Sequence, residues 1–556
     1  MERLVNRRLT EYLESTGRLD SRQHAFRPGR GTNTYLASLT QILEDNKVQL
    51  GATTSKTTKE ETGVPQGSVI AVTLFLVAMA EVFVNLPKDI YIIVYADDIV
   101  LVAVGKHPKV VRRKAQAAVN RVAKWAQAAG FQMAANKCIR VHICQSNHHL
   151  PKRPITLDGN TIPVKKSVKL LGVTFDRKLT FKTHFNNIKE ACRTRTNMIK
   201  LISRKRTRSD RRTRLRVADA VISSRLLYGL EATSGNFDEL ILSLAPVYNR
   251  SIRLVSGHLP STPADIACAE AGVLPFRHKA TLALCSRSIS YLERTTNNSA
   301  PCCLVDRANA ALHHASQQHL PKIAGLHRLG AASWNRAKPK IDLSLKANLR
   351  KGPNKKQAQT LFRNLLETRY PTSTIRYTDG SKLAGRVGLG VDCSSGTTSS
   401  YRIPDMCSVF SAEAAAIFQA TIQPSEDPVL IVTDSASVLA AITSDSNRHP
   451  FIQAIQANLD NNTTLTWVPG HAGIQGNESA DILAGIGRSS PFLCRVVPAE
   501  DAKLWAKHTV SSSWASEWRD QRNICRMVKN STLPVKTSQI IGNRWYFPGC
   551  EQVIPT

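Results

Sequence analysis

Between residues 371 and 490, short apolar runs and helical stretches follow one another in an order that suits a mixed sheet. Three runs typical of strands come first, then a helix, a strand and a helix, and finally a strand and a helix. This order predicts an α/β domain with helices packed on a five-stranded sheet. Ser411 and Ser435 are placed to cap the first two helices. The predicted strands are 374–378, 387–391, 399–403, 429–432 and 464–468.

Four acidic residues lie at the edges of these predicted elements. Asp379 ends the first strand and Asp434 ends the fourth. Glu413 lies in the first turn of the first helix, and Asp481 lies in the last helix. Hard cations such as Mg²⁺ take oxygen ligands, and a two-metal site needs several carboxylates from different elements. His471, in the loop before the last helix, is placed to move protons near a leaving group.

The sequence words around these acids carry a family resemblance. YTDGS, SAEAAA, VTDS and WVPGHAGIQGNESAD, in this order and spacing, resemble type 1 ribonuclease H, particularly the version in non-LTR retrotransposons of the I and Jockey kind. The resemblance implies hydrolysis of the RNA strand of an RNA–DNA hybrid with two Mg²⁺ ions, or Mn²⁺ in their place. It implies that the metal ligands are Asp379, Glu413, Asp434 and Asp481, with His471 as the catalytic-loop histidine. The alternative is an unrelated α/β domain with coincidental acids.

The first part of the chain has a separate signature around Tyr95-Ala96-Asp97-Asp98. Apolar runs at 90–94 and 99–104 flank it, which predicts a hairpin with two acids at its tip. Alone, an Asp-Asp pair is also a common solvated turn. A helix is predicted over 110–129 and a strand over 168–175. The accompanying motifs, in order, are QHAFRPGRGT (23–32), GVPQGS (63–68), GFQMAANKC (130–138) and KLLGVTFD (169–176).

Together these motifs resemble the reverse transcriptase of the same retrotransposons over about residues 1–240. The resemblance implies an α+β palm in which Asp97 and Asp98 bind Mg²⁺. It also implies that Gln66 and Gly67, within GVPQGS, lie near template and incoming nucleotide. The run SSRLLYGLEA, from Ser223, resembles the thumb and connection region of these enzymes.

One departure from the reverse-transcriptase pattern matters for activity. The family places a further strand-borne aspartate, in an F-x-D-x-x-x-A-F-like motif, well upstream of GVPQGS. Here only 32 residues separate Arg30 from Gly63, and no such motif lies among them. Asp45 is the only aspartate available there, and its context is helical and polar. Because nucleotidyl transfer needs its metal-ligating carboxylates, the polymerase half is predicted to be incomplete and inactive.

The formal net charge of +33 indicates an anionic partner, for which nucleic acid is the default. Residues 371–490 carry a net charge of −5, which leaves +38 on the rest of the chain. Residues 193–216 hold 11 Lys/Arg and one Asp, a run that could contact phosphates, form a solvated helix face or act as a nuclear-localisation signal. The phosphate contacts we expect are Arg204, Lys205, Arg206, Arg211 and Arg212.

The expected organisation has five parts. They are a partial reverse transcriptase (1–184), a helical basic thumb and connection region (185–330), a linker (331–370), the ribonuclease H domain (371–490) and a C-terminal tail (491–556). The tail's tryptophans are expected to pack rather than stack on bases. The chain begins too late for the endonuclease domain of full elements, so it is interpreted as a truncated or internally deleted polyprotein copy.

The longest apolar run, 69–80, is short of the roughly 18 residues that a membrane span requires, so no membrane partner is expected. Twelve scattered cysteines without a CxxC pair suit reduced thiols, and no secretory signal begins the chain. The protein is thus predicted to be intracellular, in the nucleus or cytoplasm, with RNA, DNA and their hybrids as partners. Two alternatives stay open: a working polymerase with ribonuclease H, and a non-catalytic nucleic-acid-binding relic. No sequence feature indicates an oligomeric state.

Overall fold

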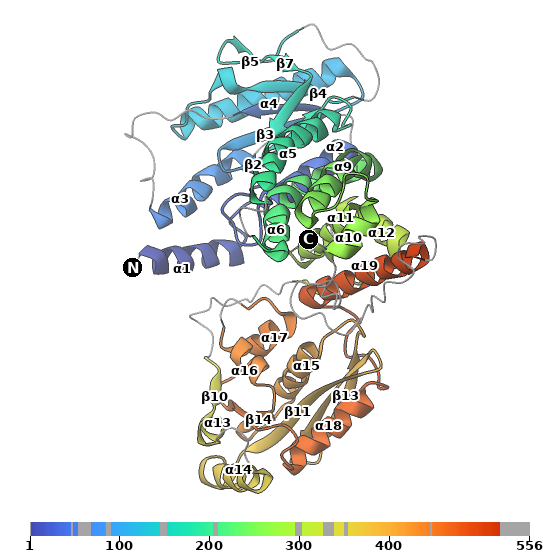
Figure 1. Ribbon diagram of the computed structural model, residues 1–556. Coiled ribbons are helices and arrows are strands. Elements are labelled where there is room, and N and C mark those ends of the chain that lie inside the picture. Colours follow the sequence, from blue (N-terminus) through green and yellow to red (C-terminus); the bar gives the residue numbers. More distant parts are fainter. Residues whose placement is uncertain are drawn as a thin grey trace. The chain divides into compact units, whose positions relative to one another are not determined.

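The chain divides into two compact units, each with its own sheet (Figure 1). The first comprises Met1–Ser288, Ala300–His319 and Lys507–Thr556, and the second comprises Ile289–Ser299 and Leu320–Ala506. The structure is a computed structural model that describes residues 2–45, 48–53, 68–84, 90–144, 153–203, 209–294, 303–325, 338–349, 354–444 and 447–522. Within these ranges no helix is long and apolar enough to cross a membrane.

The first unit is built on a five-stranded sheet in the order β2-β3-β1-β4-β7. The predicted hairpin is confirmed, with Tyr95 paired to Asp98 across its turn. β1 is the central strand of this sheet and pairs antiparallel with β3 on one side and β4 on the other. The strands are β1 (Val48–Thr53), β2 (Ile90–Tyr95), β3 (Asp98–Val104), β4 (Ile139–His142) and β7 (Val164–Lys165).

Helices α3 (Val69–Ala80) and α4 (Pro108–Ala128) supply the apolar cover for the hairpin side of this sheet. Val122 of α4 belongs to one buried cluster with Ile92 and Leu101 of the hairpin. The helix predicted over 110–129 begins two residues earlier, with a proline in its first turn, where the fixed φ of proline suits helix entry.

The strand predicted over 168–175 is in fact a hairpin of two strands, β8 (Ser167–Leu170) and β9 (Val173–Asp176). Leu171 and Gly172 form its turn with φ angles of +43° and +82°. Two consecutive positive φ values match the twist of a tight hairpin, and glycine supplies one of them without steric cost. The apolar run was misread because a leucine occupies the other turn position.

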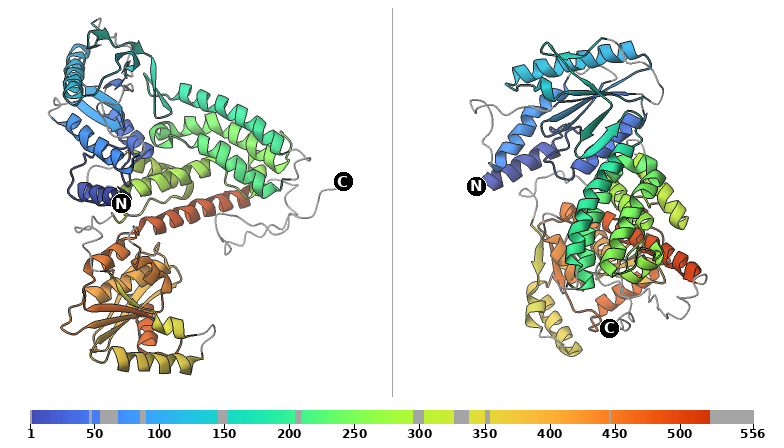
Figure 2. Two further views of the ribbon diagram at one scale, coloured as in Figure 1. Left: turned by 90° about the vertical axis from the view of Figure 1, so that its left-hand side faces the viewer. Right: turned by 45° about the horizontal axis from the view of Figure 1, so that its top comes forward.

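The predicted helix-rich middle of the chain is confirmed. Figure 2 shows these helices in green, with α5 packed along α9. Its main helices are α5 (Lys182–Ile202), α6 (Arg211–Ala218), α9 (Phe237–Ser256), α10 (Ala264–Ala271), α11 (Phe276–Arg294) and α12 (Cys303–Ser316). Other elements of this unit are α1 (Glu2–Ser15), α2 (Thr32–Asp45), β5 (Thr156–Leu157), β6 (Asn160–Thr161), α7 (Ser224–Leu226) and α8 (Leu230–Thr233).

Part of the predicted tail is the helix α19 (Ala499–Arg522). Trp514 and Trp518 of this helix are buried against Ala269 of α10, with their ring centroids 5.8 Å apart. The expectation that the tail's aromatics pack is therefore confirmed for these two. Trp505 is half-buried, and Trp545 lies outside the described residues.

The second unit contains a mixed six-stranded sheet in the order β10-β15-β14-β11-β12-β13. β11, β12 and β13 form an antiparallel meander, whereas β14 pairs parallel with both β11 and β15. The five predicted strands are all present, and β10 is an additional one, parallel to β15. The strands are β10 (Lys340–Asp342), β11 (Thr374–Leu383), β12 (Arg386–Cys393), β13 (Thr398–Ile403), β14 (Val429–Thr433) and β15 (Thr463–Trp467).

The segment predicted as a linker, 331–370, is not a plain connection. Its described residues include β10, α13 (Ser344–Asn348) and α14 (Lys355–Arg369). Phe362 and Leu365 of α14 belong to a buried cluster with Leu430 and Val432 of β14. The exposed Lys355 and Lys356 begin α14, while Ala358, Phe362 and Leu365 recur at helical spacing and are buried.

Helices cover both faces of the second unit's sheet. Successive residues of a strand face opposite sides of the sheet, so glycines in β11 and β12 show which helix lies on each face. Gly380 in β11 faces α15 (Val409–Ile422), and a Cβ there would lie 2.5 Å from the Glu413 backbone nitrogen. Gly388 and Gly390 in β12 face α18 (Gln475–Gly487), whose backbone leaves no room for a Cβ. α16 (Ala436–Ile442) and α17 (Pro450–Asn458) pack beside α15.

The expected capping serines behave differently from the prediction. α15 begins at Val409, and its N-cap is Ser408, whose hydroxyl accepts from the Ser411 backbone N–H at 3.2 Å. Ser411 is therefore inside the helix and fully buried. Ser435 does occupy the N-cap position of α16, but its hydroxyl makes no capping bond and lies 3.2 Å from Ser437 Oγ.

We predict that Phe362→Ala destabilises the second unit by about 3–5 kcal/mol, the usual cost of removing a buried phenylalanine. Its ring is buried and packs edge-on to Tyr377 of β11 at 6.3 Å. The measurement is native-state hydrogen exchange of the β14 amides in the whole chain. Arg363→Ala, an exposed change one residue along the same helix, is the control and should leave protection unchanged. Equal protection in both variants would show that α14 is not part of this core.

Candidate functional site

Three carboxylates from different elements of the second unit converge on one place. β11 continues past Asp379 to Leu383, so this aspartate does not end its strand as predicted. It lies instead where the neighbouring strand stops, because Thr378 pairs with Thr433, the last residue of β14, and Asp434 follows. With Glu413 from α15, the ligand oxygens of these three side chains all lie within 4.8 Å of one another.

Burial and mutual repulsion make this cluster electrostatically unfavourable without a cation. Asp379 and Glu413 are each 8 % exposed. Burial, and then the charge of Asp434, raises the pKa of Asp379. Burial, and then the charge of Asp379, raises the pKa of Glu413, and burial also raises the pKa of Asp434. Like charges in a low-dielectric site oppose ionisation of one another, and a bound cation reverses that effect.

The donor set fits a divalent metal ion. Glu413 Oε2 is buried and has no hydrogen-bond partner in the structure. Such an atom is costly unless something else satisfies it. Asp379 Oδ1, by contrast, accepts from the Gly380 N–H at 2.7 Å, which fixes the orientation of that carboxylate. An all-oxygen set with one unsatisfied buried oxygen is what a hard cation requires.

Asp434 is held from the side of β15. Trp467 Nε1 donates to the Asp434 carbonyl at 2.9 Å, which fixes the backbone just after β14. Gly470, in the loop that follows β15, lies against the carboxylate itself, since a Cβ there would come 2.6 Å from Asp434 Oδ2. The glycine in the PGHAG motif therefore provides room for a metal ligand.

The two remaining predicted residues lie together but outside the tight cluster. Asp481 is in α18 and does not belong to the group of three within 4.8 Å. His471 Nδ1 lies 4.0 Å from Asp481 Oδ2, and the two side chains are 80 % and 43 % exposed. His471 has a φ of +53°, an uncommon value for a residue with a side chain. The loop thus presents its imidazole to solvent beside the carboxylate group.

The His471 loop is held by residues that the sequence analysis did not identify. Gln359 of α14 donates from Nε2 to the carbonyls of Ala472 and Gly473, at 3.3 and 2.8 Å. The Gly473 N–H donates to Glu478 Oε1 at 3.0 Å. Gln359 gave no signal because its segment was interpreted as a linker, and a single glutamine on a polar helix face is unremarkable.

The Asp97–Asp98 pair in the first unit is less complete. Asp97 is exposed in the turn, while burial and then Asp97 raise the pKa of Asp98. Within the described ranges, no third Asp, Glu, His or Cys joins them at metal-ligand spacing. The adjacent strand β1 has the sequence VQLGAT, which contains no acid, and it ends with Thr53 paired to Ile99.

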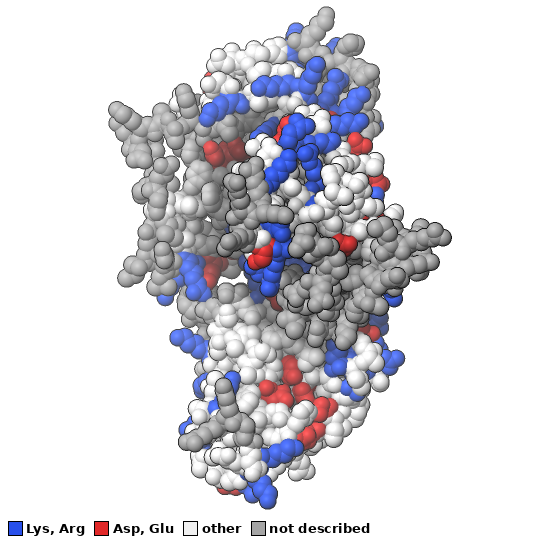
Figure 3. Space-filling view, viewed as in Figure 1, with Lys and Arg blue, Asp and Glu red and all other residues white. Residues whose placement is uncertain are grey.

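Most of the predicted nucleic-acid contacts cannot be placed. Gln66, Gly67, Arg204, Lys205 and Arg206 lie outside the described residues. Arg211 and Arg212 begin α6, where the Arg211 guanidinium donates to the Glu270 carbonyl and Arg212 is exposed. On the face shown in Figure 3, Lys and Arg side chains gather over the first unit, and a group of acidic side chains lies on the second.

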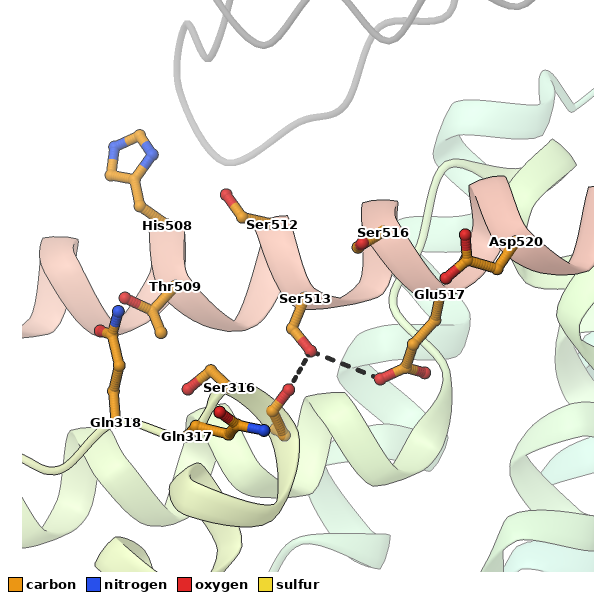
Figure 4. Close-up of a pocket in the computed structure, with 11 residues that line it drawn as sticks. Ser316, Gln317, Gln318, His508, Thr509, Ser512, Ser513, Ser516, Glu517 and Asp520 are labelled. Atoms are coloured by element: carbon orange, nitrogen blue, oxygen red, sulfur yellow. Dashed lines mark hydrogen bonds between the residues drawn. The ribbon is translucent and has the colours of Figure 1, made fainter.

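A depression of about 580 Å³ in the first unit lies apart from these groups, between the end of α12 and α19 (Figure 4). The Ser513 hydroxyl bonds to the Ala315 carbonyl and also points toward Glu517 Oε1 at 3.4 Å. No Lys or Arg is among the lining residues, so this depression offers no cation for a phosphate.

A mixed sheet that gathers carboxylates where β14 ends, with α15 and α18 on opposite faces, defines a ribonuclease H-like domain. Family models agree along the chain: a reverse transcriptase (RNA-dependent DNA polymerase) model matches residues 36–175, and an RNase H model matches residues 371–489. The two matches confirm the predicted order of a reverse-transcriptase domain followed by ribonuclease H.

Curated relatives come from mobile elements of flies. The RNA-directed DNA polymerase from mobile element jockey of Drosophila melanogaster is 26 % identical over 201 residues, which are 35 % of this chain and 22 % of that protein. Its Drosophila funebris counterpart is 25 % identical over 177 residues, 31 % of this chain and 19 % of that protein. The probable RNA-directed DNA polymerase from transposon BS of D. melanogaster is 23 % identical over 234 residues, 40 % of this chain and 25 % of that protein. The chain thus spans a quarter or less of these relatives' lengths.

These matches confirm the resemblance drawn from the motifs. The chain contains a reverse-transcriptase domain followed by a ribonuclease H domain, an arrangement that supports a relationship to the polyproteins of non-LTR retrotransposons.

We predict that Gly470→Ala weakens divalent-cation binding at the carboxylate cluster by roughly tenfold or more, the scale typical of displaced support around a metal site. The added methyl would collide with Asp434 Oδ2 and push that ligand away. Calorimetric titration of the whole chain with Mn²⁺ measures the effect. Gly485→Ala in α18 is the matched control, because its Cβ meets nothing closer than 3.6 Å. Unchanged Mn²⁺ affinity in Gly470→Ala would place the cation elsewhere.

Proposed function

We propose that this protein hydrolyses the RNA strand of RNA–DNA hybrids endonucleolytically, with divalent metal ions held by its ribonuclease H domain. The observation that carries the proposal is the buried convergence of Asp379, Glu413 and Asp434, with Glu413 Oε2 left without a protein partner. Acids scattered on an α/β surface would have no reason to lie this close, because burial and repulsion make the arrangement costly without a cation.

The proposed site uses two Mg²⁺ ions, for which Mn²⁺ can substitute. Asp379, Glu413 and Asp434 would hold them from the buried side, and Asp481 would complete the set from α18. When bound, the ions supply an activated water and stabilise the charge on the leaving 3′-oxygen. His471, exposed beside Asp481, would pass a proton to that oxygen. Gln359 would keep the histidine's loop in place through its two backbone bonds.

Substrate grip is assigned to the basic part of the chain outside residues 371–490. The ribonuclease H segment carries a net charge of −5, so it has little attraction for a polyanion, whereas the rest of the chain carries +38. Lys and Arg neutralise phosphates and release counterions, which supplies affinity without sequence preference. Hybrid geometry and 2′-hydroxyls would be read by shape rather than by base edges. The exposed Arg212 is a candidate contact among the described residues.

We further propose that the polymerase domain does not extend a primer. The Asp97–Asp98 turn is formed, but the strand beside it has no acid between Val48 and Thr53. Nucleotidyl transfer with two metal ions needs carboxylates from more than one strand to hold them. A domain of this kind can still bind template and primer through its charge and so serve the nuclease.

Cleavage of a labelled RNA–DNA hybrid with Mg²⁺ is the direct test of the nuclease. We expect the whole chain to cut only the RNA strand, EDTA to abolish cutting, and Asp434→Asn to reduce the rate by roughly a hundredfold or more, as expected for loss of a charged metal ligand. Asp427→Asn is the matched control, since this exposed aspartate precedes the opposite end of β14. No cutting by folded protein would instead favour the nucleic-acid-binding relic.

Primer extension tests the polymerase domain. With an RNA template, an annealed DNA primer, all four deoxynucleotides and Mg²⁺, we expect no elongation above background, because a metal-ligating carboxylate is missing. Gel analysis at single-nucleotide resolution measures the outcome, and a gel-shift assay on the same template confirms that the protein binds it. Elongation that Asp98→Asn abolishes would refute the proposal and establish the alternative of a working polymerase.

A further inference from the structure

Asp501 lies 12 residues beyond the end of the matched ribonuclease H segment, in the first turn of α19, yet it is a buried part of the second unit. It is 6 % exposed. Its Oδ2 accepts two hydrogen bonds from the start of α15, one from the Ser408 backbone N–H at 3.0 Å and one from the Ser411 hydroxyl at 2.5 Å. A charged acceptor bonded to buried donors is among the stronger hydrogen-bonding arrangements in proteins.

His449, the N-cap residue of α17, completes a chain of hydrogen bonds with these groups. Its Nε2 lies 2.9 Å from Ser411 Oγ. Because the single Ser411 hydroxyl proton is directed to Asp501, His449 must be the donor and carry its proton on Nε2. Burial lowers the pKa of His449 to about 4, so the ring is neutral at physiological pH. The network thus runs from α17 through α15 to α19.

The same three residue types form the catalytic triad of serine hydrolases, but this arrangement cannot act that way. In a triad the histidine lies between serine and aspartate, so that it can remove the serine proton. Here Ser411 bonds directly to Asp501, and its side chain is fully buried. No substrate carbonyl could reach it. The network therefore serves to hold structure in place.

The network holds the first turn of α15, which leads directly into Glu413. Ser411 lies in the first turn of α15, two residues before Glu413. Because α15 begins at Val409, Glu413 lies just after the first turn and not within it as predicted. This turn presses on β11 at Gly380, the neighbour of Asp379, with no room for a methyl group between them. A shift or rotation of the first turn would therefore change the separation of the Glu413 and Asp379 carboxylates. Metal sites depend on such outer partners because they orient the direct ligands.

We propose that Asp501 is a positioning residue of the ribonuclease H centre, which fixes the first turn of α15 and thereby sets Glu413 for metal binding. The proposal rests on the proposed function for the role of the centre. It also extends the functional domain beyond residue 489, because the segment that supplies Asp501 lies outside the family match. Asp501 is not one of the three acids whose ligand oxygens converge.

The central test compares Asp501→Ala, Asp501→Asn and the unmodified whole chain. Removing the carboxylate leaves the Ser408 N–H and the Ser411 hydroxyl without their acceptor, so the turn loosens. For Asp501→Ala we expect Mn²⁺ affinity and kcat for hybrid cleavage to fall roughly tenfold to a hundredfold, the range for lost outer partners of metal ligands. KM for the hybrid should stay unchanged, because phosphate grip lies elsewhere. Asp501→Asn keeps one acceptor oxygen, so its Mn²⁺ affinity and kcat should lie between those of Asp501→Ala and those of the unmodified chain.

Two controls separate positioning from general destabilisation. Glu500→Ala changes the exposed neighbour of Asp501 in the same turn and should behave as the unmodified chain. Phe362→Leu trims the core of the same unit without touching α15, and should lower thermal stability while sparing Mn²⁺ affinity and kcat. All activities are measured below the melting temperature of each variant. Where Asp501→Ala does not fold, Asp501→Asn decides, because it preserves the shape of the site.

The outcomes distinguish this proposal from the proposed function. Unaltered Mn²⁺ affinity and kcat in the folded Asp501 variants would overturn it, and so would equal losses in Phe362→Leu. If the unmodified chain binds Mn²⁺ but cuts no hybrid, the proposed function fails. The Mn²⁺ titration would still support or overturn positioning by Asp501 in that case.

Discussion

The fold of the second unit holds together three carboxylates that repel one another. One oxygen from each lies within 4.8 Å of the others, and two of the three residues, Asp379 and Glu413, are buried. Repulsion would drive them apart if their backbones could yield. They cannot yield easily, because Asp379 is in the middle of a strand paired on both sides and Asp434 directly follows another. The sheet thus holds an unfavourable charge arrangement, and the proposed divalent cation would relieve it.

Close backbone approach is what makes this convergence achievable. At Gly380 the first turn of α15 lies directly on β11, and at Gly470 the loop after β15 lies directly on the Asp434 carboxylate. Elements from outside the matched segment then limit movement, with Gln359 bonded to the His471 loop and Asp501 bonded to α15. The three converging carboxylates are carried by regular helices and strands or lie directly after them. Their separation therefore changes mainly when a whole helix or strand moves. The contacts between helices and strands therefore fix the positions of these carboxylates more than contacts to the carboxylates themselves do.

The sequence predicted the three acids that converge and the five strands of the ribonuclease H segment, because both are local patterns. Acids that follow apolar runs, within family words, identify Asp379 and Asp434 without any knowledge of packing. The supporting residues escaped because their meaning is set by distant partners. Asp501 is one acid among many in a basic chain until α19 folds back on Ser411, and Phe362 lay in a stretch whose polar composition suggested a linker. Ser411 was predicted to be a helix cap. Its actual environment is buried and is formed with Asp501 and His449, which are far away in sequence and give no local signal.

In the first unit the sheet is formed, but the strand beside the Asp97–Asp98 turn carries no acidic residue. Its sheet has a strand, β1, between β3 and β4, and β1 pairs with residues 99–104 of the hairpin. Strand pairing uses groups that all residues carry, and Val48–Thr53 can satisfy it with no acid. Metal binding uses side-chain oxygens, which only particular residues carry. The acid-free strand β1 therefore preserves the pairing of the sheet but offers no carboxylate beside the Asp97–Asp98 turn.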